Sequence, residues 1–139
     1  MSVRDVRVRY AGGDRLDIAI GDHSLVVDQP HPDGGRDAGP TPTELFIASL
    51  VSCMGFFAQR FLRRNGVDAD GLELEAKATF ADRPSRIGSI DLVVRLPPID
   101  ESLVAPLRRV IEHCTVHNTL THPPVLRIEL DVTGRKEVA

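Results

Sequence analysis

The chain has 139 residues and a formal net charge of −3, with 42% hydrophobic and 27% charged residues. This length and balance predict one soluble globular domain over residues 1–139 and exclude a disordered chain. A nucleic-acid partner would need a basic footprint and stacking aromatic side chains. The negative charge and the absence of tryptophan argue against one.

The first residues of the chain lack the apolar core of a secretory signal. The longest uncharged run within a helical pattern, residues 45–59, is too short to span a bilayer. Two cysteines without such a signal indicate a reducing compartment. We therefore expect a cytoplasmic protein without a membrane partner.

Three segments with period-two alternation open the chain, at residues 6–10, 16–20 and 23–28. Glycine-containing turns separate them, which predicts an antiparallel meander. Residues 29–40 follow and hold three prolines and three glycines. We expect a loop without regular structure there, and loops of this length in compact domains are often functional.

A long helix is predicted over residues 41–65. Thr41 is expected as its N-cap and Glu44 as the reciprocal partner in a capping box, while Gly66 ends the helix. The helix is apolar on nearly every side as far as Phe57, so more than one layer must cover it. That pattern favours a second subunit as part of the cover.

The second half of the chain alternates strands with one more helix. Period-two alternation predicts strands at residues 72–80, 91–96 and 126–132. The helix begins near residues 100–102, and its apolar stripe ends at Cys114. The order βββ-α-ββ-α-β predicts an α+β fold with mostly antiparallel pairing.

The two cysteines are the first candidates for chemistry. Cys53 lies too far inside the long helix for its N-terminus to activate the thiol, so a reactive Cys53 needs a cation from elsewhere. Free cysteines also serve as small buried hydrophobic residues, and a Cys53–Cys114 disulfide would close a long loop. The sequence leaves open whether the two sulfurs meet.

A metal site is an alternative, because His113, Cys114 and His117 with Cys53 would offer donors that zinc accepts. On one helix, however, the two histidines share a face that is offset from Cys114. No paired Cys-x-x-Cys signature accompanies them. We therefore expect no metal and no cofactor.

Three charged residues could assist a thiol. Arg15 and Arg36 lie in glycine-flanked segments, and each is either an ordinary surface residue or a cation that can reach a thiolate. Glu44 either completes the capping box alone or also orients such a cation at the mouth of a pocket.

Two segments carry a family resemblance. Residues 39–54, with the run GPTPTELF and the triplet SCM, resemble the first cysteine motif of the OsmC/Ohr family. This family comprises osmotically induced protein C and the organic hydroperoxide resistance proteins. Residues 110–114 resemble its second cysteine motif, and the resemblance covers almost the whole chain. It implies an intertwined homodimer whose sheets wrap long central helices.

The resemblance also implies thiol peroxidase chemistry. Cys53 would attack an organic hydroperoxide, release an alcohol and become a sulfenic acid, which Cys114 would convert to a disulfide. An external dithiol would then reduce the disulfide. The runner-up function is a non-catalytic dimer that binds a small apolar or acyl ligand between its helices.

The remaining site residues follow from the same resemblance. Arg15 is the nearest match to the arginine that activates the thiolate. Glu44 would orient it, although the glutamate of the family motif falls at the position of Thr43 here. Phe46 and Phe57 would line an apolar pocket that favours organic hydroperoxides.

Overall fold

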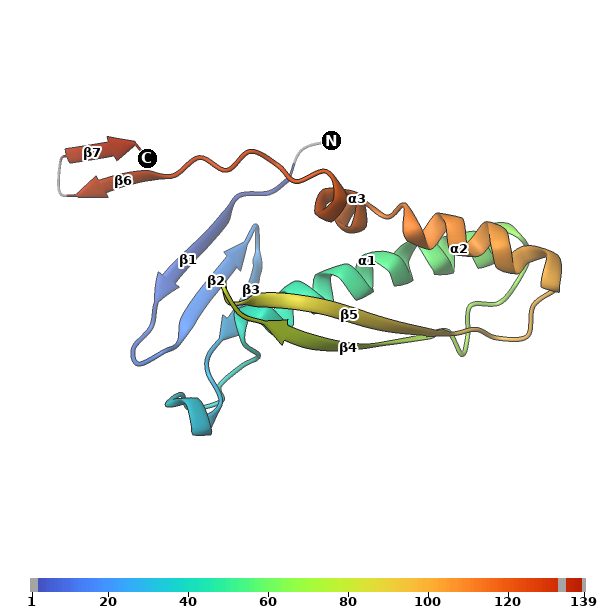
Figure 1. Cartoon of the computed structure of the whole chain (residues 1–139), viewed down its shortest axis with the longest axis horizontal. Helices are drawn as coiled ribbons and strands as arrows, with labels where there is room; N and C mark the ends of the chain where they lie inside the picture. The colour runs from blue at the N-terminus through green and yellow to red at the C-terminus, as the bar shows by residue number, and fades with distance from the viewer. Residues whose placement is uncertain (1–2, 133–134, 139) are drawn as a thin grey trace. The chain divides into compact units, whose positions relative to one another are not determined.

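The computed structural model describes residues 3–132 and 135–138 (Figure 1). These residues form the predicted α+β fold, with three α-helices and antiparallel sheets. The chain divides into two compact units. The first runs up to Ser52 and includes Glu73–Arg95, and the second consists of Cys53–Leu72 and the chain from Leu96 onward.

The first unit begins with the predicted meander. β1 (Val6–Tyr10), β2 (Leu16–Ile20) and β3 (His23–Val27) pair antiparallel in that order. Val8 pairs with Ile18 across the first ladder, so the apolar members of the alternation share one face. The expected strands are confirmed to within one residue.

A second hairpin belongs to the same unit. β4 (Glu73–Ala81) and β5 (Arg86–Arg95) pair antiparallel, with a bulge at Thr79/Phe80. β5 starts earlier than the alternation predicted, because Arg86 pairs with Ala81 directly after the turn. Hydrogen bonding to β4 therefore extends the strand beyond its period-two pattern.

The loop at residues 29–40 contains one turn of 3-10 helix, η1 (His31–Asp33), so the expectation of no regular structure was wrong there. The buried carboxylate of Asp28, only 2% exposed, organises this loop. It accepts hydrogen bonds from the backbone N–H groups of Gln29 at 2.7 Å, Arg36 at 3.3 Å and Ala38 at 3.1 Å. The Asp28 carboxylate thus pairs three backbone N–H groups that belong to no strand or helix.

α1 (Pro42–Arg64) begins and ends as predicted. Thr41 Oγ1 accepts the backbone N–H of Glu44 at 3.1 Å, and the Glu44 carboxylate accepts that of Thr41 at 2.9 Å. At the other end Gly66 has φ +72°, and the Val67 N–H donates to the Leu62 carbonyl at 2.9 Å. This is a Schellman motif, in which glycine is favoured because φ is positive.

α1 is incompletely covered by its own chain. Phe46 and Phe56 are 43% and 48% exposed. By length and composition alone the helix is also apolar enough to cross a membrane, a criterion that the core helix of a soluble protein equally meets. The sequence-based expectation that more than one layer must cover this helix therefore agrees with its exposed aromatic side chains.

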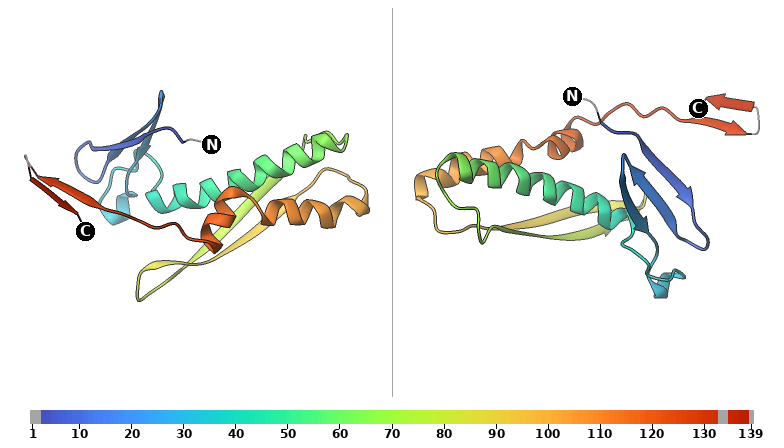
Figure 2. Two further views of the ribbon diagram at one scale, coloured as in Figure 1. Left: turned by 90° about the horizontal axis from the view of Figure 1, so that it is seen from above. Right: turned by 180° about the vertical axis from the view of Figure 1, so that it is seen from behind.

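In the second unit, α2 (Val104–Glu112) packs beside the end of α1 (Figure 2). Ala58 and Leu62 of α1 and Leu107 of α2 are buried together at 0–2% exposure. The start of this helix differs from the prediction, because one 3-10 turn, η2 (Glu101–Leu103), precedes it. Leu107 fixes the face that α2 turns toward α1.

The predicted second helix is interrupted where it was expected to continue. α2 ends at Glu112, and a third helix, α3 (Thr115–Thr121), begins after Cys114. Cys114 has an extended backbone, with φ −68° and ψ 156°, and its side chain caps α3. The expectation of one helix continuing past Cys114 was wrong, because this residue separates two helices.

The last strand is also shorter than predicted. β6 (Glu129–Val132) pairs antiparallel with β7 (Arg135–Val138), a strand that the sequence did not predict. Leu126, at the start of the predicted strand, is 83% exposed and lies outside any strand. Period-two alternation alone does not make a strand, because each strand needs a hydrogen-bonded neighbour.

Candidate functional site

The two cysteines lie close together within the second unit. Both are free thiols; Cys53 is half-buried on α1, and Cys114 is fully buried between α2 and α3. The Cys53 side chain is near enough to the Cys114 thiol to influence its pKa. This answers the question that the sequence left open, since 60 intervening residues return the chain to the same place.

The surroundings of Cys114 favour the protonated, neutral form of its thiol. Burial raises the pKa of the Cys114 thiol above its ordinary value, while the His117 backbone N–H works in the opposite direction. The hydrogen bond and charge of Cys53 raise the pKa further. The neutral thiol form of Cys114 is therefore favoured beside Cys53.

The position of Cys114 depends on the start of α3. Its Sγ accepts the backbone N–H of His117 at 3.3 Å, which is the hydrogen bond of an N-cap side chain. Sulfur is a weak acceptor compared with the usual hydroxyl or carboxylate oxygen. The cap therefore fixes the direction of the thiol within the core.

Aromatic side chains flank Cys53 on the same helix. Phe57 lies one turn further along α1 and is half-buried. Its ring meets that of Phe56 edge to face, with 5.3 Å between centroids, and the Arg60 guanidinium lies over the Phe56 ring at 5.3 Å. The second unit thus places an apolar, aromatic surface beside the half-buried thiol.

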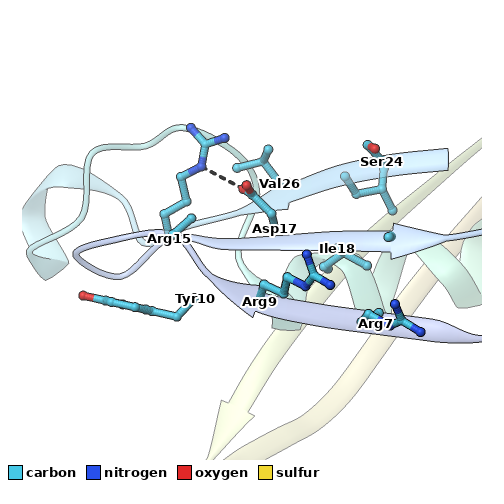
Figure 3. A pocket seen from close by; sticks show the side chains of 11 residues that line it. Arg7, Arg9, Tyr10, Arg15, Asp17, Ile18, Ser24 and Val26 are labelled. Atoms are coloured by element: carbon cyan, nitrogen blue, oxygen red, sulfur yellow. Dashed lines mark hydrogen bonds and ion pairs between the residues drawn. The ribbon is translucent and has the colours of Figure 1, made fainter. Parts of the chain in front are cut away.

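Arg15 lies in the first unit, on the rim of a hollow of about 730 Å³ that Arg7 and Arg9 also line (Figure 3). Its Nε donates to the Asp17 carboxylate at 2.9 Å, and the two side chains are 43% and 52% exposed. Its charge also contributes to lowering the pKa of Asp28, after the backbone N–H groups that bind this carboxylate. Arg15 is therefore paired with carboxylates of its own unit.

The other two charged candidates also have local partners. The backbone N–H of Arg36 is bound by Asp28, and its side chain is exposed. The N–H and hydroxyl of Thr41 lower the pKa of the Glu44 carboxyl. The capping role of Glu44 is confirmed, and its role in orienting an arginine stays a prediction.

A metal centre receives no support from the part of the chain that the structure describes. There, no group of three or more histidine, cysteine, aspartate and glutamate side chains is arranged to hold an ion. His113 and His117 lie on either side of the break between α2 and α3, so they do not share one helix face.

His117 is the residue whose role the sequence did not suggest. It was considered only as a metal ligand, yet its backbone N–H binds the buried sulfur. The signal was present in the spacing, because the third residue after an N-cap donates to the cap side chain. Recognising it required knowing that a helix begins at Cys114.

Comparison with known proteins identifies the class. The family model of OsmC-like proteins matches residues 34–129. The match covers more than half of the chain, so this protein belongs to the OsmC-like family. No curated protein matches the sequence.

Solved structures share the fold at low sequence identity. A Psychrobacter arcticus protein, provisionally named for the osmotic stress and detoxification response, has a TM-score of 0.77 at 20% identity, covering 86% of this chain and 89% of its own. An organic hydroperoxide resistance protein OsmC from Legionella pneumophila has a TM-score of 0.62 at 14% sequence identity. The match covers 86% of this chain and 91% of that protein. OhrB of Bacillus subtilis is also an organic hydroperoxide resistance protein and has a TM-score of 0.61 at 21% sequence identity. The match covers 86% of this chain and 92% of OhrB.

Proposed function

We propose that this protein is a cytoplasmic, homodimeric thiol peroxidase that reduces organic hydroperoxides to alcohols in defence against oxidative stress. The observation that carries the proposal is that the half-buried Cys53 lies near enough to the fully buried Cys114 to influence its pKa. Membership of the OsmC-like family, and the names of its hydroperoxide-resistance relatives, support the same activity.

Cys53 performs the first step. Its thiolate attacks the distal oxygen of the hydroperoxide, the O–O bond breaks, and the alkoxide leaves as the alcohol after taking up a proton. The Cys53 sulfur keeps the distal oxygen together with its hydrogen and becomes a sulfenic acid. Partial exposure suits Cys53 to this step, because the attacking sulfur must be reached from solvent, whereas Cys114 is 0% exposed.

Cys114 performs the second step. Its sulfur attacks the Cys53 sulfenic acid, a disulfide forms and water leaves, which protects Cys53 from further oxidation. An external dithiol then reduces the disulfide by thiol exchange, so the cycle needs no bound cofactor. The raised pKa of Cys114 keeps it protonated until the sulfenic acid is present.

Arg15 is the proposed cationic partner of the Cys53 thiolate, with Glu44 as the residue that orients it. The pair of Arg15 with Asp17 is half-exposed, and such pairs are worth about 0–1 kcal/mol. The guanidinium can therefore exchange Asp17 for a thiolate at little cost. One Glu44 oxygen caps Thr41, and the carboxylate keeps further lone pairs for an arginine.

The proposed substrate preference rests on aromatic side chains. Phe57 lies one turn from Cys53, and Phe46, on the first half of α1, is 43% exposed. A surface of this kind favours the organic part of a hydroperoxide, because burying apolar area contributes about 25 cal/mol per Å². Hydrogen peroxide would gain nothing from it.

The proposed homodimer explains the strand faces that this chain leaves uncovered. Val6, Val8 and Tyr10 of β1 are 51–73% exposed on one face of an edge strand. Four alternating apolar residues near the C-terminus are exposed by 51–83%: Leu126, Ile128, Leu130 and Val132. A second copy would bury these faces and the exposed aromatic residues of α1.

The decisive experiment counts thiols. Reduced protein is mixed with one equivalent of cumene hydroperoxide, and free thiols and alcohol are measured over time. We expect rapid loss of two thiols per chain with one cumyl alcohol formed, and no alcohol from Cys53→Ser. Unchanged thiols, or equal alcohol from Cys53→Ser, would contradict the proposal. Light scattering of the same sample tests the homodimer, which a monomeric mass would exclude.

A further inference from the structure

One buried nitrogen in the second unit lacks a partner. Nδ1 of His117 is inaccessible to solvent, and among the described residues it is the one buried side-chain nitrogen or oxygen without a hydrogen bond. Most buried polar atoms in folded proteins are paired, because leaving one unpaired destabilises the folded state. The unpaired imidazole nitrogen of His117 therefore calls for an explanation.

The same residue is bound to the thiol pair. The backbone N–H of His117 donates to Cys114 Sγ at 3.3 Å, and Cys114 interacts with Cys53. The covalent geometry of one histidine keeps its ring within a few ångströms of its own backbone nitrogen. The ring that carries the unpaired Nδ1 thus belongs to the residue that binds the buried thiol, although no hydrogen bond joins Nδ1 to a sulfur in the reduced protein.

The other ionisable groups near the break between α2 and α3 are few and can be named. From α1 the group is Cys53 itself, and from the end of α2 it is Glu112, which pairs with Arg108 at 3.7 Å. His113 is exposed, and the His122 ring shares a hydrogen bond with the Thr121 hydroxyl. His117 is the group at this junction whose buried acceptor is unused.

We propose that His117 is a positioning residue for Cys114, which it holds through its backbone N–H, and that its Nδ1 accepts the Cys114 proton during disulfide formation. This proposal rests on the proposed peroxidase cycle. Imidazole suits the task, because it is the side chain that ordinarily exchanges protons near neutral pH. A buried thiol with a raised pKa needs such an acceptor before it can attack.

The step balances in atoms and electrons. The Cys114 thiol proton moves to Nδ1, and the resulting thiolate attacks the Cys53 sulfur. The S–S bond forms as the S–O bond of the sulfenic acid breaks, and the proton on Nδ1 passes to the departing hydroxide to give water. Cys114 is oxidised and the sulfenic sulfur of Cys53 is reduced, so no other reactant is needed.

The test compares three variants. His117→Leu removes the ring nitrogen and keeps the backbone N–H, whereas His117→Asn keeps a side-chain acceptor that does not titrate. His113→Asn is the matched control on the other side of Cys114. For each protein, the rate of disulfide formation after one equivalent of cumene hydroperoxide is followed from about pH 5 to about pH 9, a range that spans imidazole and thiol titration.

We expect both His117 variants to form the disulfide roughly 10²-fold more slowly at neutral pH, the lower range for loss of a proton acceptor. Their rates should rise only at higher pH, where the thiol ionises by itself, while His113→Asn follows the wild type. Formation of the Cys53 sulfenic acid, trapped with dimedone in a Cys114→Ser background, should not change.

A thermal melt separates this role from a structural one. Removing an unpaired buried polar atom is neutral or stabilising, so His117→Leu should melt no lower than the wild type. A folded His117→Leu with an unchanged rate profile overturns the proposal. A loss that is equal at every pH, or a large fall in melting temperature, reduces His117 to a structural residue and also overturns it.

Failure of the peroxidase itself is recognised separately. If the wild type loses no thiols and Cys114→Ser forms no dimedone-trapped sulfenic acid with cumene hydroperoxide, the proposed function fails. The same variants are then compared with diamide, a thiol oxidant that makes the Cys53–Cys114 disulfide without peroxide. A pH profile in diamide that shifts in both His117 variants supports proton acceptance by His117, and an unshifted one rejects it.

Discussion

The starts of α1 and α3 use the same hydrogen-bond geometry with different atoms. At α1, the Thr41 hydroxyl binds the N–H of Glu44, and the Glu44 carboxylate returns a second hydrogen bond on an exposed surface. At α3, one buried sulfur, that of Cys114, binds the N–H of His117. The first start is doubly capped by oxygen, and the second is capped once by a weaker acceptor.

The two caps differ in what the capping side chain can do besides stabilising the start of its helix. An oxygen cap such as Thr41 is worth about 1 kcal/mol to its helix, and serine or threonine would serve equally well before α3. A buried cysteine at that position gives up capping strength, while its thiol lies against Cys53. Oxygen atoms thus cap the exposed start of α1, and a buried sulfur near Cys53 caps the start of α3.

Replacing the sulfur cap with oxygen should have the largest effect on function. Cys114→Ser keeps a capping side chain, so we expect the free energy of unfolding to change by no more than about 1 kcal/mol. With one equivalent of cumene hydroperoxide and no added thiol, the wild type should form the Cys53–Cys114 disulfide, whereas this variant should stop at a Cys53 sulfenic acid that dimedone traps, because no resolving thiol remains. A wild type that also accumulates the sulfenic acid would show that Cys114 is only a cap.

The loop that leads into α1 should tolerate substitution poorly. A Cβ added at Gly39 would collide with the Val26 carbonyl oxygen, so Gly39→Ala should destabilise the protein by about 1–3 kcal/mol. Gly66→Ala is the matched control, because a Cβ there meets nothing within 4 Å and only the positive φ is strained. Denaturant unfolding of both variants measures the difference, and equal losses would contradict this packing.

Removing the oxygen cap itself should have a smaller effect. Thr41→Ala deletes the acceptor for the Glu44 N–H, and we expect a loss of about 1 kcal/mol. Thr41→Ser keeps the hydroxyl and is expected to be nearly neutral. Chemical denaturation at neutral pH compares them. Equal stability of the alanine and serine variants would mean that the capping box contributes nothing to folding.

The smallest expected effect is the pH dependence of the same cap. The pKa of Glu44 is lowered in the folded protein, first by the Thr41 N–H and then by its hydroxyl. Its contribution is therefore present above the unfolded-state pKa and is lost as pH falls through the folded-state pKa. Glu44→Gln should be less stable than the wild type at neutral pH, and this gap should close below about pH 4.5 in denaturation experiments.

The local elements of the fold were predictable because their signals are local. Thr41 with Glu44 and Gly66 marked both ends of α1 to within one residue, and alternation located the first three strands. The break at Cys114 was missed, because the apolar stripe of the predicted helix runs up to this residue without interruption. The C-terminal strand was overestimated at Leu126, where alternation exists but a hydrogen-bonded neighbour does not.

For the candidate site, the sequence by itself determined the chemistry available: two thiols, a capped helix and the family motifs around Cys53 and Cys114. Only the tertiary structure decided that the thiols meet, that Cys114 caps α3 and that Nδ1 of His117 is buried without a partner. The physical reason is the distance along the sequence over which the interactions act. Caps and turns depend on neighbours a few residues away, whereas burial and contact depend on how α2 packs against α1 through Leu107.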